Sequence, residues 1–407
     1  MDLAQIIGTN IRTLMERRSI TIVELAKALS ISRQTLQNYL KGSNIIDSVK
    51  LVDIANYFSV PVTDLLSTPI QPSNFLFRTA LNYQLATETI STKVMNCITS
   101  YHDLSKSLGN AVAYFPEQYN LTINSNGSTI DINFGCTDYF SSKLKMTKEL
   151  KSSLRNIAIE QRKKLGIHGT NALSAISALQ QKGINIFFID MGNPQTFGSS
   201  YVDDEKGCYI FVNCNEKITL ERIIFTVFHE YGHIILHRPI YKRKIHDTPT
   251  NAFSFLDKMA NTFAGFFLVP YEELLSYDNI LNNLHSLNQL IPIKHQFQVS
   301  LQALIIALEN YEYVNRTFVS NYFNYIEANN AKEAEPEPLM NFPEIYQSFE
   351  SIKNAKILTL LRNGYLENLI DVNDVQKILW LNASSAYKVL KQFNSFSNNS
   401  DLFNKLF

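Results

Sequence analysis

The sequence predicts a multidomain protein that is mainly α-helical and contains one small β-sheet. Three observations support this fold class. The chain has 407 residues, which is enough for about two or three domains with cores of their own. It contains only 14 glycines and 12 prolines, so helix-breaking residues are sparse. Apolar residues recur at helical spacing over most of the chain, whereas the clearest runs of strand length are Ile184–Asp190 and Cys208–Asn213.

The composition excludes several classes of protein. Lysine plus arginine equals aspartate plus glutamate at 37 each, so no global charge attracts nucleic acid or a membrane, and any contact with nucleic acid has to be local. The four cysteines contain no CxxC pair, which argues against a structural zinc site and fits a reducing compartment. The sequence shows neither a signal-peptide pattern nor an apolar run of about 18 residues. We therefore expect a cytoplasmic protein that has no membrane partner.

Residues 1–68 are predicted to form an all-α domain of short helices. Within it, Thr21–Leu29 and Ser32–Leu40 have the pattern of two helices joined by a short turn. Ser32 is placed to cap the second helix at its N-terminus, and Gly42 is placed to end it. Two short helices joined in this way form a helix-turn-helix, whose second helix enters the major groove of DNA.

This segment resembles the helix-turn-helix domain of the phage-repressor (XRE/Cro) class over about 55 residues. The stretch that carries the signature is ELAKALSISRQTLQNYLKG, which ends at Gly42. This resemblance implies that double-stranded DNA is a partner. It also implies that the residues contacting bases are Arg33, Gln34, Gln37 and Asn38. Arginine can bond guanine, and glutamine or asparagine can bond adenine. The alternative is a small helical domain that binds protein. The domain has seven basic and six acidic side chains, and this nearly neutral charge favours the alternative because phosphate contacts dominate affinity for DNA.

Residues 69–149 carry no motif to which we can assign a function. The stretch Pro69–Ser73 predicts a hinge, and residues 75–108 have a helical pattern. Alternating apolar residues within Tyr119–Phe134, on both sides of an Asn-rich turn, predict a β-hairpin.

An α+β domain is predicted for residues 150–327. Its predicted elements are helices at Lys151–Leu165 and Asn171–Lys182, strands at Ile184–Asp190, Ser199–Val202 and Cys208–Asn213, and a helix that begins at Leu220. An edge strand beside a metal site can hold an extended peptide through main-chain hydrogen bonds. We expect the strand Cys208–Asn213 or its neighbour to have this role.

The helix that follows contains the stretch FTVFHEYGHIILHRP, and within it His229, Glu230 and His233 form an HExxH motif. On a helix, the two imidazoles project from one face a turn apart. Zinc binds such nitrogens, and a catalytic zinc site has three protein ligands and one position for water. Glu230 is then the general base for a water that the metal activates. The alternative is an amphipathic helix that carries the two histidines by chance.

His237 follows His233 by another four residues. An unbroken helix spreads His229 and His237 over about 12 Å, so the three rings cannot surround one ion. We expect His237 to be a helix-end residue that supports the site. The third ligand should therefore come from a second helix, and Asp257–Pro270 is the candidate, with Asp257 at its start. The alternative role for Asp257 is a carboxylate that stabilises the helix N-terminus.

The order of these elements, the sequence FHEYGHIILH and the pattern AN-x-FA-x-x-x-L-x-P are similar to the ImmA/IrrE family of metallopeptidases over residues 150–310. The resemblance implies a zincin-like fold and a zinc cofactor. The family's downstream motif is usually E-x-x-A-N-x-F-A, whose glutamate is the third zinc ligand. Asp257 stands at that position here, and Met259 stands where a further glutamate is common. Aspartate is shorter than glutamate by one methylene, which is about 1.5 Å of reach.

A linker is predicted for residues 328–343, which include the stretch EAEPEP, and a helical domain is predicted for residues 344–407. In that last domain, Val372–Leu379 and Ala383–Phe393 are either a second helix-turn-helix-like pair or an element for packing or oligomerisation. The sequence leaves the oligomeric state open, and a homodimer is one option.

These features together predict a DNA-binding regulatory zinc endopeptidase. The resemblance to ImmA/IrrE peptidases implies that its substrate is a helix-turn-helix transcriptional repressor, whose cleavage derepresses mobile-element or stress-response genes. The alternative is a non-proteolytic DNA-binding regulator whose metallopeptidase-like fold serves as a sensor or dimerisation module. A third option is self-cleavage in the Pro69–Ser73 hinge or in the EAEPEP stretch.

Overall fold

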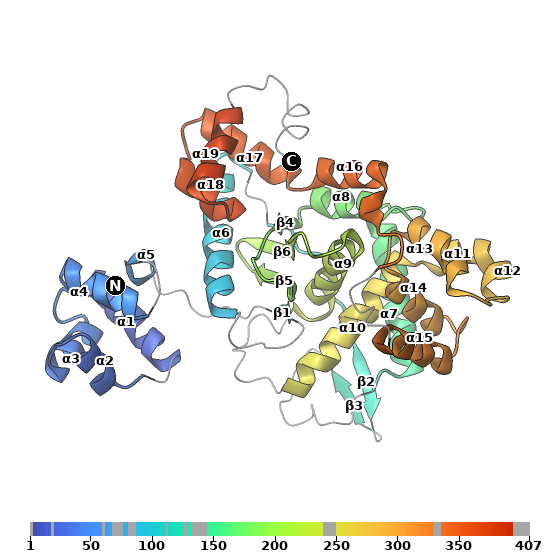
Figure 1. Cartoon of the computed structure of the whole chain (residues 1–407), viewed down its shortest axis with the longest axis horizontal. Helices are drawn as coiled ribbons and strands as arrows, with labels where there is room; N and C mark the ends of the chain where they lie inside the picture. Colours follow the sequence, from blue (N-terminus) through green and yellow to red (C-terminus); the bar gives the residue numbers. More distant parts are fainter. Residues whose placement is uncertain are drawn as a thin grey trace. The chain divides into compact units, whose positions relative to one another are not determined.

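The computed structural model describes residues 3–17, 20–58, 62–66, 76–79, 87–110, 113–125, 128–131, 145–238, 250–328 and 335–393. The chain forms two compact units, Met1–Ser73 and Asn74–Phe407. The described residues are mainly helical with a small β-sheet, so the predicted fold class is confirmed (Figure 1). The division into five sequence segments stays a prediction. Among the described residues, no helix combines the length and the apolar character that crossing a bilayer requires.

The described part of the first unit contains the helices α1 Leu3–Arg17, α2 Ile22–Ala28, α3 Arg33–Lys41, α4 Ser48–Tyr57 and α5 Val62–Leu66. The predicted ends of α3 are confirmed. The Ser32 side chain accepts a hydrogen bond from the Thr35 backbone N–H, and Gly42 ends the helix with a left-handed φ of 70°. Thr21 and Glu24 form a capping box at the start of α2. These local hydrogen bonds fix where the two helices of the motif begin and end.

One apolar core holds α3 against the other helices of this unit. Its fully buried members are Ile11, Leu25, Leu36, Ile54, Phe58 and Leu65. Helices α1 and α3 lie close together because Gly8 has no side chain, and a Cβ there would lie 2.5 Å from the Tyr39 carbonyl oxygen. The packing therefore fixes the orientation of α3, with one face buried and the opposite face exposed.

The described strands of the second unit form a four-stranded sheet in the order β1-β5-β6-β4. Their bounds are β1 Leu76–Thr79, β4 Asn185–Ile189, β5 Thr196–Asp203 and β6 Gly207–Asn213. Strand β6 runs parallel to β4 and antiparallel to β5, and β1 runs antiparallel to β5. Of the strands expected to hold a peptide, Cys208–Asn213 or its neighbour, β6 itself is not at an edge, because ladder hydrogen bonds use both of its sides, whereas its neighbour β4 is at an edge of the described sheet. The other neighbour of β6, β5, has β1 on its outer side.

The remaining secondary structure of this unit is mostly helical. The described α-helices are α6 Thr87–Ser107, α7 Lys148–Lys164, α8 Ala172–Lys182, α9 Leu220–Leu236, α10 Thr250–Leu268, α11 Tyr271–Leu274, α12 Asp278–Leu281, α13 Ile291–Phe297, α14 Leu301–Asn310, α15 Arg316–Ala328, α16 Pro343–Ile352, α17 Ala355–Leu366, α18 Val372–Leu379 and α19 Ala383–Phe393. Single 3₁₀ turns lie at Leu275–Tyr277, Leu287–Leu290 and Leu339–Asn341.

Two predictions for the segment before α7 have different outcomes. The hairpin predicted within Tyr119–Phe134 is confirmed as β2 Thr122–Ser125 paired with β3 Ser128–Asp131. Part of its predicted turn, residues 126–127, lies outside the described residues. The helix predicted from residue 75 is wrong in its first part, because residues 76–79 form strand β1 and the helix begins at Thr87. Pairing with β5 overrides the local helical pattern there.

The sheet separates two apolar clusters because its side chains alternate between its faces. On one face, Ile186 and Ile210 belong to the cluster that contains the buried residues of α8 and α9. On the other face, Phe187 and Phe211 belong to the cluster that contains those of α6, α17, α18 and α19. Figure 1 shows the sheet between α6 and α9. Helices α17, α18 and α19 therefore pack on the sheet face opposite the HExxH helix.

A buried ion-pair network fixes the chain ahead of the C-terminal helices. Lys294 is fully buried, and its Nζ lies 3.2 Å from Glu221 Oε1 and 3.0 Å from Glu335 Oε1. Glu221 Oε1 also accepts a hydrogen bond from the Leu339 backbone N–H at 2.8 Å. Removing one partner would leave an uncompensated buried charge. The network therefore holds residues 335–339, within the predicted linker, against the first turn of α9.

Candidate metal centre

Helix α9 carries the HExxH motif through the interior of the second unit. The Thr219 side chain caps its N-terminus by accepting a hydrogen bond from the Arg222 backbone N–H, and the helix continues to Leu236. Every residue from 226 to 237 is buried. The apolar residues that flank the motif therefore pack on several sides of the helix and hold the polar motif residues away from solvent.

Helix α10 packs against α9 at close range. Gly232, which lies between the motif histidines, faces α10, and a Cβ there would lie 3.0 Å from Phe263 Cδ1 and 3.4 Å from Ala260 Cα. One turn earlier, Phe228 stacks on Phe267 with the ring centroids 4.7 Å apart. With a glycine on one helix and an alanine on the other, the two backbones approach closely. A short side chain on α10 can then reach the histidines of α9.

Asp257 is the α10 side chain that does so. Its Oδ1 lies 3.5 Å from His229 Nε2 and 3.6 Å from His233 Nε2, and the two Nε2 atoms are 3.1 Å apart. Within the described residues, these three side chains form a group with the geometry of metal ligands. Helix α10 begins at Thr250, so the prediction that Asp257 starts the helix is wrong. Its alternative role as a carboxylate at the helix N-terminus also fails, because that effect acts mainly within the first turn.

The spacing of the three atoms fits a tetrahedral zinc ion. Zinc–ligand distances of about 2.0–2.1 Å in a tetrahedron place the ligand atoms about 3.3 Å apart. The separations of 3.1, 3.5 and 3.6 Å lie around this value. Two imidazole nitrogens and a carboxylate oxygen are also a donor set that zinc binds. The close packing of α9 on α10 therefore brings the Asp257 carboxylate to this spacing, although its side chain is one methylene shorter than that of glutamate.

Each histidine is oriented through its other ring nitrogen. His229 Nδ1 lies 2.9 Å from Asn261 Oδ1, so Nδ1–H donates to the amide oxygen and Nε2 keeps its lone pair. His233 Nδ1 lies 2.9 Å from His237 Nδ1, and His237 is the C-terminal cap residue of α9, as predicted. Sequence reasoning missed Asn261 as part of the site. Its position four residues after Asp257, on the same face of a helix, is the signal that could have found it.

Glu230 faces strand β5. Ser200 Oγ donates a hydrogen bond to Glu230 Oε2 at 2.5 Å, which fixes one carboxylate oxygen. Gly198 allows the strand to approach, because a Cβ there would lie 2.4 Å from Thr226 Cγ2 and 3.6 Å from Glu230 Cγ. No motif marks Ser200 in the sequence, and only the packing of β5 on α9 identifies it.

Burial and charge set the protonation of the site. Burial acts to raise the pKa of Asp257, but hydrogen bonds with His229 and His233 outweigh it and lower this pKa below its usual value. Burial lowers the pKa of His237 well below its usual value, and electrostatic interactions with His233 and His229 lower it further. The site therefore favours an ionised aspartate beside a neutral His237, and an ionised carboxylate is the form that binds a metal.

The predicted DNA-contacting residues lie on the first two turns of α3. Arg33 and Gln34 are exposed, and Gln37 and Asn38 are partly exposed. Gln34 Nε2 donates to Asn38 Oδ1 at 3.3 Å. The fold leaves these side chains on the face of α3 that is not buried in the core, and their contact with bases stays a prediction.

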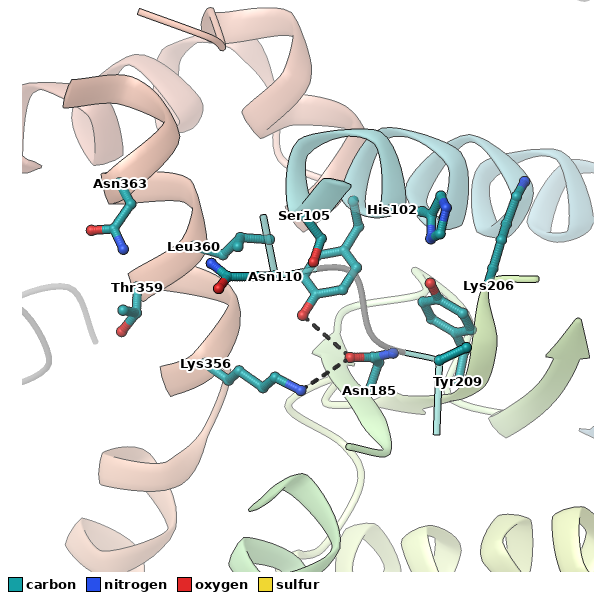
Figure 2. A pocket seen from close by; sticks show the side chains of 12 residues that line it. His102, Ser105, Asn110, Asn185, Lys206, Tyr209, Lys356, Thr359, Leu360 and Asn363 are labelled. Carbon is teal, nitrogen blue, oxygen red and sulfur yellow. Dashed lines mark hydrogen bonds between the residues drawn. The ribbon is translucent and has the colours of Figure 1, made fainter. Parts of the chain in front are cut away.

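A cavity on the other face of the sheet lies between α6 and α17. It has a volume of ≈ 380 Å³ and is lined by residues that include His102, Asn185 and Lys356. Lys356 Nζ donates a hydrogen bond of 3.3 Å to Asn185 Oδ1 (Figure 2). The Tyr101 hydroxyl donates one of 3.2 Å to the same oxygen. Because α9 packs on the opposite face, this cavity does not belong to the metal centre.

Comparison with known families identifies two segments of the chain. Residues 179–309 match the peptidase M78 family, described as an IrrE N-terminal-like domain. This segment contains the HExxH motif, Ser200 and Asp257. Residues 11–65 match a helix-turn-helix family. The resemblances predicted from the sequence are therefore confirmed for these segments. No curated protein matches the chain.

Proposed function

We propose that the chain is a zinc endopeptidase with its own DNA-binding domain, and that it cleaves a helix-turn-helix transcriptional repressor. The observation that carries this proposal is the tetrahedral spacing of His229 Nε2, His233 Nε2 and Asp257 Oδ1. The match to the IrrE N-terminal-like family supports a peptidase, and the helix-turn-helix match supports DNA binding.

The side chains have separate roles in this proposal. The two histidines and Asp257 hold zinc, which when bound polarises the scissile carbonyl and a water molecule as a Lewis acid. Glu230 accepts the proton of the attacking water and passes it to the nitrogen of the leaving amine. Ser200 keeps the Glu230 carboxylate oriented through its hydrogen bond. The substrate backbone extends along β5, whose main-chain groups lie beside Glu230.

The helix-turn-helix unit directs the peptidase to its target. Through α3 it binds the operator at which the repressor sits, with Arg33, Gln34, Gln37 and Asn38 contacting bases. Alternatively, the helix-turn-helix unit resembles the DNA-binding domain of the repressor and pairs with that domain. A homodimer would match a palindromic operator. In each case the protein acts in the cytoplasm and derepresses mobile-element or stress-response genes.

A second candidate function is a DNA-binding regulator without proteolysis, whose peptidase-like fold serves as a sensor or dimerisation module. The burial of the site favours it, because the exposed fractions of His229 and Glu230 are 0% and that of His233 is 3%. A peptide bond cannot approach these groups until part of the protein moves. In this candidate, zinc would only stabilise the fold.

Cleavage of purified repressors separates the two candidates. Zinc-loaded protein is incubated with helix-turn-helix repressors from the same genome, and products are identified by intact mass. Glu230→Gln is the matched control, since it keeps the shape and the zinc ligands but removes the carboxylate base. Cleavage by wild type but not by this variant supports the peptidase. Equal cleavage by both contradicts the role of Glu230, and zinc binding without any cleavage supports the regulator.

A further inference from the structure

The outer edge of β5 is covered by a segment of the same chain. Strand β1 pairs with it in an antiparallel register that places Leu76 opposite Ser200 and Arg78 opposite Gly198. On its other side, β5 pairs with β6. Without β1, β5 would be the last strand of the described sheet on this side. Strand β1 therefore uses the backbone groups through which an extended peptide would add to the sheet.

The covered stretch of β5 is the one that contacts the candidate base. Ser200 Oγ donates to Glu230 Oε2, and a Cβ on Gly198 would lie 3.6 Å from Glu230 Cγ. Positions two apart on a strand share a face, so both positions lie on the α9 side. The β1 backbone from Leu76 to Arg78 therefore runs along the part of β5 where the proposed function places a substrate.

Three of the groups that would act on a substrate are buried, whereas the Asp257 side chain is 33% exposed. The exposed fractions are 0% for His229 and Glu230 and 3% for His233. Proton transfer requires Glu230 to come within hydrogen-bond reach of the reacting groups, directly or through one water. In this structure the outer edge of β5 is therefore occupied by β1, and Glu230 and both histidines are buried.

We infer that β1 is an internal inhibitory strand, which occupies the docking edge of β5 as a pseudosubstrate and leaves before a substrate binds; the inference rests on the proposed function. Strand β1 has only four residues, and its register shifts between Arg78 and Thr79. Short and interrupted pairing contributes little stability, so a longer extended segment can displace it. The partner it fits is a protein segment with extended backbone and an apolar, aromatic sequence, like NFLFRTA at residues 74–80.

The position of β1 in the chain connects the docking edge to the helix-turn-helix unit. The first unit ends at Ser73 and the second begins at Asn74, so β1 starts two residues after the boundary. In this inference, DNA or a repressor bound to the first unit releases β1 if it binds more tightly to the protein in which β1 is displaced. A ligand that prefers the released state shifts the equilibrium by its difference in affinity for the two states.

Peptide binding in an inactive background tests this inference. A fluorescent peptide with the sequence of residues 74–80 is titrated into zinc-loaded Glu230→Gln protein and into a β1 variant of it. The β1 variant carries Leu76→Gly, Phe77→Ser, Arg78→Gly and Thr79→Ser. Because these substitutions lower strand propensity and raise the fraction of molecules with a vacant edge, we expect about 10- to 100-fold tighter binding. Equal binding by the two proteins overturns the inference.

A matched control comes from the other four-residue strand. The β3 variant, which carries Ser128→Gly, Thr129→Ser, Ile130→Gly and Asp131→Ser, disturbs the separate β2–β3 sheet and should leave peptide binding unchanged. Amide exchange checks the fold, since β6 should stay protected while the outer amides of Thr196–Ser200 exchange faster in the β1 variant. If the β1 variant fails to fold, Arg78→Pro, which removes one backbone donor, replaces it.

Cleavage separates the inhibition from the proposed function. With Glu230 intact, we expect the β1 variant to cleave a helix-turn-helix repressor about tenfold faster than wild type, or more. Equal cleavage rates of the two proteins contradict inhibition by β1 but leave the proposed endopeptidase activity supported. If peptide binding increases but neither protein cleaves, β1 is confirmed as the occupant of a binding edge and the endopeptidase proposal fails. Self-cleavage within residues 74–80 of zinc-loaded wild type would make β1 a substrate and overturn the inference.

Discussion

The close packing of α9 on α10 predicts that one methyl group at Gly232 weakens the metal centre. A Cβ there would lie 3.0 Å from Phe263 Cδ1. Restoring this contact to an ordinary 3.4 Å requires Phe263, or α10 as a whole, to shift by about 0.4 Å, because protein interiors have few voids. Asp257 moves with α10, and metal sites keep their ligand distances within about 0.2 Å. A shift of α10 by this amount therefore displaces the Asp257 carboxylate by more than the tolerance of a metal–ligand distance.

We expect Gly232→Ala to weaken zinc binding about tenfold, which is about 1.4 kcal/mol. The free energy of unfolding of the metal-free protein should change by about 2 kcal/mol or less, because alanine gains about 1 kcal/mol over glycine in helix propensity while overpacking costs about 1–3 kcal/mol. Competition for zinc with a chromophoric chelator measures the first quantity, and urea unfolding measures the second.

Gly265→Ala on α10 is the matched control. A Cβ at this position meets no heavy atom within 4 Å, although it adds the same methyl group to the same pair of helices. Zinc affinity should stay at the wild-type value, and stability should rise by up to about 1 kcal/mol. If Gly232→Ala binds zinc as tightly as Gly265→Ala, the reasoning that close helix packing brings a short aspartate to the metal is refuted.

Three further predictions concern single side chains. Asp257→Ala should abolish stoichiometric zinc binding, measured by elemental analysis after dialysis, because one of three ligands is lost; an undiminished zinc content would remove Asp257 from the site. Asn261→Ala should lower zinc affinity about 10- to 100-fold, because it frees the ring of His229, and an unchanged value in the chelator assay would contradict this role. The pKa of Glu24 is lowered by hydrogen bonds with the Thr21 backbone and side chain, so its stabilisation of α2 should be complete above the ordinary pKa of 4.5 and be lost as pH falls through the lower folded-state value. Amide exchange of α2 in full-length wild-type and Glu24→Ala protein measures this, and identical pH profiles of the two would count against it.

The parts of the fold that were predictable depend on local interactions. The helix-turn-helix follows from the cap at Ser32, the left-handed residue Gly42 and apolar residues at helical spacing. Each of these acts within a few residues of chain. The histidines and glutamate of HExxH were predictable for the same reason, because a spacing of four on a helix fixes the relative direction of two side chains.

The features that the sequence did not determine depend on which distant segments pair. Strand β6 has the sequence of a buried strand, but whether it lies at an edge depends on β4 and β5, which hydrogen-bond to its two sides. The residues of β1 have a helical pattern and form a strand only because β5 offers an unpaired edge. Asp257 is inside α10 and not at its start, because the helix begins at Thr250. The boundaries of an element are less strongly specified by sequence than its existence.

The sequence by itself determined which side chains α9 supplies to the candidate centre. These are the imidazoles of His229 and His233 and the carboxylate of Glu230, at fixed spacing on one helix. Only the tertiary structure decided whether Asp257 reaches them, which side chains orient them, and what covers β5. The physical reason is that these features depend on distances between segments far apart in the chain, set by close contacts such as that of Gly232 with α10. Local propensity does not determine such distances. The packing of the whole unit determines them.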